Sequence, residues 1–219
     1  MKAVLVTGAN RGIGLELCRQ LKARGDSVIA VCRSSSAELD ALGVRVEKGV
    51  DVTNDASVGA LAKKLEGTAI DVLVNNAGVL ERDGLDKLDF DKIRHQLEIN
   101  SLGPLRVTAA LLPRLHAGSK VIVLTSLMGS NTDNGSGGFY GYRMSKAAVN
   151  IAAVSLARDL APKQIAVLLV HPGMVRTDMT GHNGIEPSEA VRGILARIDE
   201  LDMKRSGHFL HQNGKELPW

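Results

Sequence analysis

Aromatic residues are scarce in this chain: they make up 3% of its 219 residues, with three Phe, one Trp and two Tyr. A core must therefore be built from Val, Leu, Ile and Ala, which suits strands covered on both faces by helices. No run approaches the about 18 apolar residues that a membrane-spanning helix needs. The apolar run at the N-terminus is too short for a signal peptide. We therefore expect a cytoplasmic protein with no membrane contact.

The chain also has few cysteines and only a small net charge. The two cysteines, Cys18 and Cys32, form no C-x-x-C pair and lie near no histidine cluster, so we expect buried free thiols and no metal site. The net charge is +3, without a basic block or interleaved aromatics. This pattern argues against a nucleic-acid partner.

Short apolar runs alternate with longer amphipathic stretches along the whole chain. Strands are predicted at 2–8, 27–33, 44–52, 70–78, 120–126, 165–173 and 207–211, and helices at 12–24, 54–66, 89–116, 141–160 and 187–201. This alternation indicates an α/β, three-layer Rossmann fold: a doubly wound parallel sheet of about seven strands with helices on both faces. No linker is evident, so residues 1–219 are expected to form one domain.

The first predicted strand runs directly into TGANRGIG at 7–14. Glycines at a strand-to-helix turn let the backbone approach a pyrophosphate, and the helix N-terminus offers free N–H groups. The segment is expected to bind a dinucleotide, with a simple tight turn as the alternative. An acidic residue after the second strand would favour NAD. The chain has Arg33 there and Arg11 in the glycine turn, which favours NADP(H) over NAD(H), because guanidinium groups bind phosphate. A solvated surface role for Arg33 stays open.

Several further motifs follow in order: DV at 51–52, NNAG at 75–78, Asn100, Ser126, Y-x-x-x-K at 142–146 and HPGMVRTDM at 171–179. Together with the glycine turn they resemble the short-chain dehydrogenase/reductase family over nearly the whole chain. The form YGYRMSK, after a polar insert at 129–138, is most similar to the C-factor/sniffer-type carbonyl reductases.

Both tyrosines of the chain lie in FYGYRMSK at 139–146. Tyr142 and Lys146 are one helical turn apart and share a face. A neighbouring ammonium, and the charge of an oxidised nicotinamide, should lower the tyrosine pKa and make it an acid–base group. Tyr140 has Met144 at the same spacing and lacks the cation. It is expected either to line the substrate pocket or to pack at the helix start.

The resemblance implies site residues for the rest of the chain. The implied catalytic residues are Asn100, Ser126, Tyr142 and Lys146, with Ser130 as the alternative to Ser126. The implied cofactor-binding residues are Gly8, Asn10, Arg11, Gly12, Ile13, Gly14, Arg33, Asp51, Val52, Asn75, Ala77, Gly78, Tyr142, Lys146, Pro172, Gly173, Val175 and Thr177. A structural role is expected for His171.

These features predict an NADP(H)-dependent oxidoreductase acting on a small-molecule carbonyl or alcohol, of the carbonyl reductase type. The alternative is a catalytically weak dinucleotide-binding sensor or signalling protein on the same fold. The short segment after Thr177 suggests an open site. By resemblance, a homodimer would form through the helices at 89–116 and 141–160, and a tetramer is also compatible.

Overall fold

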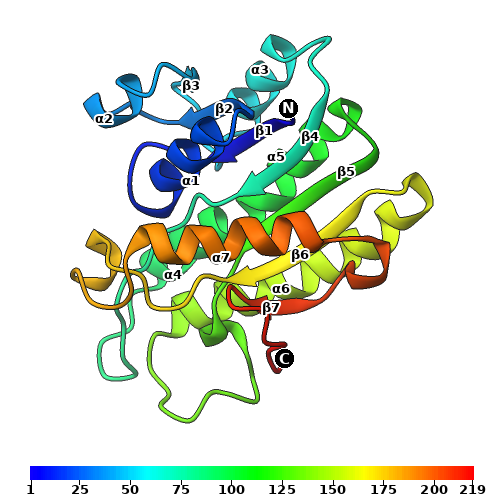
Figure 1. The fold of residues 1–219 in the computed structure, drawn as a ribbon. Helices are drawn as coiled ribbons and strands as arrows, with labels where there is room; N and C mark the ends of the chain where they lie inside the picture. Colours follow the sequence, from blue (N-terminus) through cyan, green and yellow to red (C-terminus); the bar gives the residue numbers. More distant parts are fainter.

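The computed structural model describes residues 1–219 as a seven-stranded parallel sheet with helices on both faces (Figure 1). The strands are β1 (Ala3–Thr7), β2 (Ser27–Cys32), β3 (Arg45–Lys48), β4 (Ile70–Asn75), β5 (Leu115–Leu124), β6 (Ala166–His171) and β7 (Phe209–His211). The helices are α1 (Gly12–Ala23), α2 (Ala37–Asp40), α3 (Asp55–Lys64), α4 (Phe90–Leu97), α5 (Gly103–Leu111), α6 (Tyr140–Leu160) and α7 (Pro187–Glu200). The predicted fold class is confirmed.

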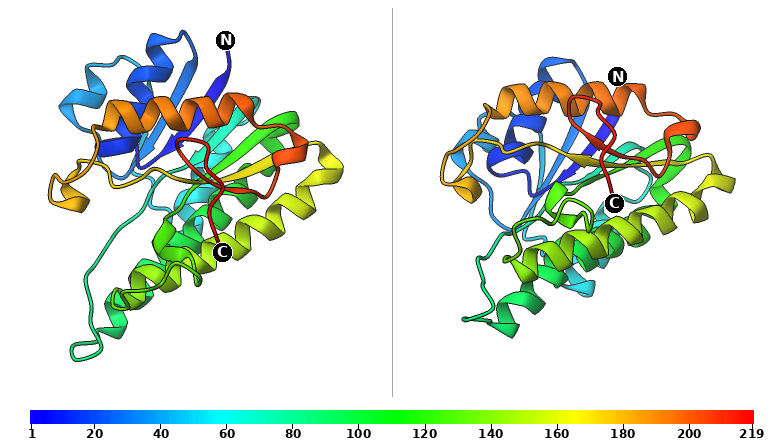
Figure 2. Two further views of the ribbon diagram at one scale, coloured as in Figure 1. Left: turned by 60° about the horizontal axis from the view of Figure 1, so that its bottom comes forward. Right: turned by 90° about the horizontal axis from the view of Figure 1, so that it is seen from below.

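Alternating strand residues build two cores, one on each side of the sheet. In β1, Val4 and Val6 belong to the core beneath α1 and α7, and Leu5 belongs to the core beneath α3, α5 and α6. This is the two-residue period of a strand buried on both faces. The right-hand view of Figure 2 shows α7 and α6 on opposite sides of the sheet. No helix combines the length and apolar character needed to cross a membrane.

In the strand order β3-β2-β1-β4-β5-β6-β7, the chain adds strands first on one side of β1 and then on its other side. The chain first builds outward from β1 to β2 and β3, and then returns to place β4 on the other side of β1. In such sheets the crevice between the carboxyl ends of the two strands at the switch point is the usual ligand site. The fold therefore places the candidate site between the segments that follow β1 and β4.

The helix predicted at 89–116 is wrong as a single element. It is divided into α4, a π-helical segment at Glu98–Leu102 and α5, and β5 begins at Leu115 rather than at 120. Pro104 explains the division, because proline has no N–H to donate to the carbonyl of Asn100 four residues earlier. The N–H of Gly103 bonds instead to the carbonyl of Glu98, five residues back.

Other boundaries differ by less. The strand predicted at 44–52 ends at Lys48, because Gly49 turns the chain with a φ of 80°. The short helix α2 was not predicted, and Ser36 caps it by accepting a hydrogen bond from the N–H of Leu39. Asn54 caps α3 by accepting a hydrogen bond from the N–H of Ser57. Both cysteines are buried and free, as predicted.

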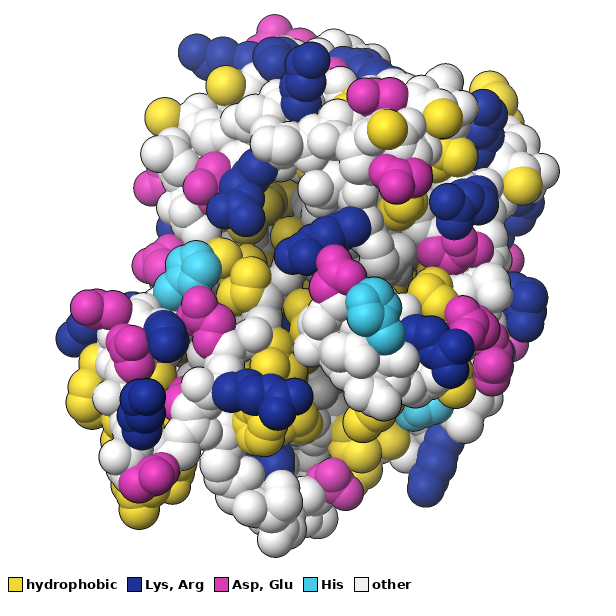
Figure 3. All heavy atoms as spheres, turned by 90° about the vertical axis from the view of Figure 1, so that its left-hand side faces the viewer, with side chains coloured by type: hydrophobic (Ala, Val, Ile, Leu, Met, Phe, Trp, Pro, Cys, Tyr) yellow, Lys and Arg dark blue, Asp and Glu magenta, His cyan; other side chains and the backbone are white.

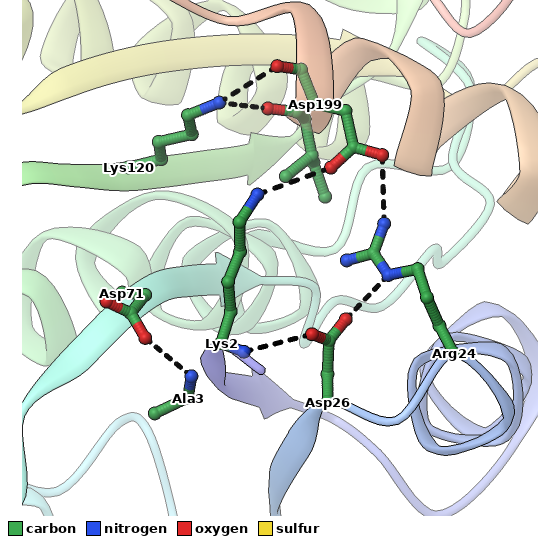
Figure 4. Close-up of polar contacts among 8 residues, drawn as sticks. Lys2, Ala3, Arg24, Asp26, Asp71, Lys120 and Asp199 are labelled. Atoms are coloured by element: carbon green, nitrogen blue, oxygen red, sulfur yellow. Dashed lines mark hydrogen bonds and ion pairs between the residues drawn. The ribbon is translucent and has the colours of Figure 1, made fainter.

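An ion-pair network ties the elements together at the edge where the strands begin (Figure 4). The carboxylate of Asp26 accepts hydrogen bonds from the backbone N–H of Lys2 at 3.0 Å and from Nε of Arg24 at 2.6 Å. Arg24 and Lys2 both also contact the carboxylate of Asp199 in α7. Lys120 of β5 donates to the carbonyls of Ile198 and Asp199, where α7 ends. These contacts fix α1 and α7 against the sheet.

We predict that Asp26→Asn destabilises the protein by about 1 kcal/mol at neutral pH, because charge-assisted hydrogen bonds are lost. Burial raises the pKa of Asp26, but hydrogen bonds and charge from Lys2 and Arg24 outweigh it and leave the pKa lowered. The stabilisation is therefore complete above the ordinary pKa of 3.8 and is lost as the pH falls below it. Urea unfolding at neutral and acid pH measures the difference. The control is Asp91→Asn on the exposed face of α4, and an equal loss in both variants would contradict the prediction.

Candidate active site

A cleft of about 830 Å³ lies along the carboxyl ends of the strands. Figure 3 shows this face hollowed, with apolar side chains inside and charged side chains of both signs and histidines around the rim. Fifteen of the predicted site residues line the cleft: Gly8, Asn10, Arg11, Gly12, Ile13, Gly14, Arg33, Asp51, Val52, Ala77, Gly78, Tyr142, Lys146, Pro172 and Thr177. Asn75, Asn100, Ser126, Gly173 and Val175 lie outside its lining. Residues that line it without having been predicted as site residues include Glu38, Asn76, Arg176, Met179 and His182.

The glycine turn forms one wall of the cleft. Gly8 has a φ of 64°, and a Cβ there would lie 2.8 Å from Cα of Ala77, so only glycine permits this approach. A Cβ on Gly14 would collide with the carbonyl of Gly8. Arg11, the residue before α1, makes no side-chain cap. The first N–H groups of α1 are thus left to a ligand, and this cradle fits the phosphates of a dinucleotide.

The segment after β4 is bonded to this turn. The hydroxyl of Thr7 accepts hydrogen bonds from the backbone N–H groups of Asn76 and Ala77, at 3.0 and 3.1 Å. The side-chain amide of Asn76 donates to the carbonyls of Thr7 and Gly8, at 2.7 and 3.1 Å. Asn75 points elsewhere and donates to Oγ1 of Thr108 at 3.0 Å. Asn76 rather than Asn75 is therefore the asparagine of NNAG at the cleft.

Arg33 and Asp51 lie at the end of the cleft beside β2. A hydrogen bond from the N–H of Thr53 is the main cause that lowers the pKa of Asp51, and the charge of Arg33 contributes. Arg33 has no carboxylate within ion-pair distance. Arg11 instead pairs with Asp178 at 3.1 Å, and both side chains are exposed. Arg33 thus lines this end of the cleft without an ion-pair partner. Arg11 joins the glycine turn to the segment after Thr177.

Tyr142, Lys146 and Ser126 meet at the opposite end. Tyr142 and Lys146 are buried in α6, and Nζ of Lys146 lies 5.7 Å from the tyrosine ring centroid. Nζ also donates to the carbonyl of Leu124, at the end of β5, at 3.0 Å. Ser126 follows the same strand, and its hydroxyl is close enough to the phenol of Tyr142 to affect the pKa of that group. The structure thus brings together three of the four predicted catalytic side chains.

The expected lowering of the tyrosine pKa is not found. Burial raises the pKa of Tyr142 to about 12, and the neighbouring Ser126 hydroxyl opposes this shift only in part. Burial also lowers the pKa of Lys146 to about 8. Both shifts favour the neutral forms, because a charge without water around it is costly. In the protein itself Tyr142 is therefore a protonated phenol, suited to donating a proton.

Asn100 lies in the π-helical segment and joins the site indirectly. Its side-chain amide bonds to both backbone groups of Val79 at 2.9 Å and donates to Oγ of Ser145 at 2.9 Å. A Cβ on Gly78 would lie 3.2 Å from Oδ1 of Asn100 and 3.8 Å from Nζ of Lys146. Asn100 thus holds the segment after NNAG against α6, one layer behind the cleft.

Tyr140 and His171, the remaining candidates, both lie outside the cleft. Tyr140 is 37% exposed, against 7% for Tyr142, and lines a smaller hollow beside Ser130 and Met144. It lies at the helix start and outside the cleft. His171 also lies outside the cleft lining, edge-on to His211 with 5.2 Å between ring centroids. Burial and the neighbouring His211 lower the pKa of His171 to about 4, so it is neutral.

We predict that Tyr142 titrates well above the ordinary tyrosine pKa of 10. Replacing Tyr140 with Phe leaves Tyr142 as the only tyrosine, so ultraviolet absorbance of tyrosinate reports that group alone. Because burial disfavours the charged tyrosinate, the titration midpoint of Tyr142 should lie close to the pH at which the protein unfolds in alkali. The control is Tyr142→Phe, which retains the exposed Tyr140. An equal midpoint for the two tyrosines would refute the effect of burial.

Comparisons with known proteins agree with this geometry. Residues 2–187 match the family model of short chain dehydrogenases. The chain is 46% identical to 1-hydroxy-2-glutathionyl-2-methyl-3-butene dehydrogenase of Rhodococcus sp. (strain AD45), over all of both proteins. It is also 46% identical to C-signal of Myxococcus xanthus, over 68% of this chain and 93% of that protein.

Two solved structures are closely similar. The carbonyl reductase Sniffer of D. melanogaster superposes with a TM-score of 0.93 at 28% identity, covering all of both chains. An NADPH-bound carbonyl reductase from chicken fatty liver superposes with a TM-score of 0.91 at 30% identity, covering 100% of this chain and 99% of that one. The resemblance read from the sequence motifs is confirmed. This chain belongs to the short chain dehydrogenase family of oxidoreductases.

Proposed function

We propose that the protein is an NADP(H)-dependent oxidoreductase of the carbonyl reductase type, with Tyr142 as its general acid and base. The observation that carries this proposal is that Tyr142 and Lys146 line one end of a single cleft, with Ser126 beside Tyr142. The other end of that cleft holds the glycine cradle and Arg33. The site would therefore bind a dinucleotide and present its nicotinamide end to the tyrosine.

The residues of the chain would divide the chemistry between them. Bound NADPH would supply the hydride. Tyr142 would donate its phenolic proton to the carbonyl oxygen of the substrate, and Ser126 would hydrogen-bond the same oxygen. Lys146, held by the carbonyl of Leu124, would stabilise the phenolate that remains and hold the nicotinamide ribose. In the reverse direction Tyr142 would accept the proton of an alcohol.

The guanidinium of Arg33 supports NADP(H) over NAD(H), because it lines the cleft and forms no ion pair within it. The chicken carbonyl reductase, to which the chain is similar, contains NADPH. Glu38 also lines this end of the cleft and would disfavour a 2′-phosphate. The preference therefore depends on the guanidinium outweighing that carboxylate.

A narrower substrate class is favoured by the Rhodococcus relative, whose name specifies an alcohol with a glutathionyl group. Glutathione carries two carboxylates. Arg82 and Arg143 lie near the start of α6 without an acidic partner: Arg82 is over the ring of Phe139, and Arg143 bonds to carbonyls and to Ser136. We therefore propose a glutathione thioether that bears an alcohol or carbonyl as a second candidate substrate.

We also propose a dinucleotide-binding sensor or signalling protein as the alternative function, and a homodimer as the assembly. C-signal, a relative with a signalling name, supports the reading in which output passes through a partner. Exposed apolar side chains on α5 and α6, Leu105, Met144 and Ile151, support pairing of two copies through these helices.

We predict that Arg33→Ala raises the NADPH dissociation constant by about tenfold, because a charge-assisted hydrogen bond to the 2′-phosphate is lost. The NADH constant should stay unchanged. Fluorescence titration with both cofactors measures this. The control is Arg45→Ala, which pairs with Glu47 outside the cleft. Equal weakening of NADH and NADPH would contradict a role in phosphate recognition.

We predict that the protein oxidises NADPH in the presence of aldehydes, ketones or quinones, or reduces NADP⁺ with a glutathione thioether alcohol. Tyr142→Phe should lower kcat by about a hundredfold or more, since the proton donor is removed, while NADPH still binds. Absorbance of NADPH across this panel measures both directions. Tight NADPH binding with no turnover on any compound would favour the sensor reading. Failure to bind either cofactor would overturn the whole proposal.

A further inference from the structure

The loop between β4 and α4 reaches the first turn of α6, the helix that carries Tyr142. Oδ1 of Asp83 accepts the backbone N–H of Tyr140, and Oδ2 accepts that of Gly141 at 2.9 Å. The backbone carbonyl of Asp83 accepts the N–H of Phe139 at 3.1 Å. Asp83 thus satisfies three consecutive N–H groups at the start of a helix 57 residues away in sequence.

The helix needs this contribution because its own sequence supplies no cap. The residue before α6 is Phe139, which has no polar side chain and makes no capping hydrogen bond. Its φ of 52° lies in the left-handed region, which is unfavourable for a bulky residue and persists only where its surroundings enforce it. Without Asp83, the first N–H groups of α6 would have no partner in the protein.

We propose that Asp83 is a positioning residue for Tyr142. The proposal rests on the proposed function, in which the Tyr142 phenol is the proton donor. Tyr142 is the third residue of α6, directly after the two N–H groups that Asp83 binds. Ser126, whose hydroxyl affects the pKa of that phenol, is on a different element, after β5. If the first turn frays, the phenol moves relative to that serine, and small displacements of reacting groups are costly to a rate.

The surroundings of Asp83 are built tightly. A Cβ on Gly141 would collide with Nε2 of Gln96 and lie 3.1 Å from Oδ2 of Asp83. Gln96 is fully buried in α4, and its Oε1 accepts the N–H of Glu81 at 3.0 Å. Figures 1 and 2 show the loop between β4 and α4 extending past the sheet at the end where α6 begins. The loop therefore connects Val79, at the cleft, with the start of the catalytic helix.

The chain offers a matched control in Asp86. Asp86 lies in the same loop, is exposed and makes no hydrogen bond or ion pair, so Asp86→Ala changes the charge equally without touching α6. Asp83→Ala removes both side-chain acceptors. Asp83→Asn removes the charge but keeps one acceptor oxygen.

We expect Asp83→Ala to lower kcat by about tenfold or more, with the NADPH dissociation constant unchanged, because the phenol is misplaced and the cofactor cradle is not. Asp83→Asn should recover part of the rate, and Asp86→Ala should match the unmodified protein. Hydrogen exchange should speed up at the amides of Tyr140 and Gly141 in Asp83→Ala alone. An unchanged kcat in Asp83→Ala, with or without a lower melting temperature, would overturn the proposal.

A readout without substrate separates this proposal from the proposed function. In the Tyr140→Phe background, the ring NMR signals of Tyr142 report its packing directly. We expect Asp83→Ala, but not Asp86→Ala, to shift or broaden them. If the unmodified protein turns over no substrate yet these signals change, the proposed function fails and the positioning role stands. Unchanged signals in Asp83→Ala overturn the positioning role whatever the activity.

Discussion

The hydroxyl of Thr7 and the side chain of Asn76 form the contact on which the site depends. They join the ends of β1 and β4, the two neighbouring strands at the switch point of the sheet, through four hydrogen bonds of 2.7 to 3.1 Å. Buried polar groups are stable only when paired, so this arrangement fixes the two segments together. Gly8 is then held within reach of Ala77, where no side chain fits, and the start of α1 faces the cleft.

The reactive end is governed by the cost of burial. Tyr142 and Lys146 share one face of α6, and burial drives their pKa values apart, from 10.0 to about 12 for Tyr142 and from 10.5 to about 8 for Lys146. Burial thus biases both side chains toward their neutral forms. The protein prepares a proton donor there, and a negative charge on the phenol has to be stabilised by what the site binds.

Much of the site is held from behind by residues that touch no ligand. Pro104 interrupts the helical bonding of the chain at Asn100, and the side chain of Asn100 then secures the segment after NNAG through Val79. Asp83, later in the same segment, secures the start of α6. The loop between β4 and α4 is therefore both a wall of the cleft and a support for the catalytic helix.

The sequence alone determined the alternation of strands and helices, the glycine turn and the Tyr142–Lys146 pair, because these depend on local periodicity and on spacing within one element. It could not decide that Asn76 rather than Asn75 reaches the cleft, since that depends on which side of the sheet each residue faces at the end of β4. Nor could it reveal Asp83, whose partners lie 57 residues away. The direction of the Tyr142 pKa shift was wrong from sequence because the spacing shows a nearby cation, whereas only the packed structure shows how far water is excluded.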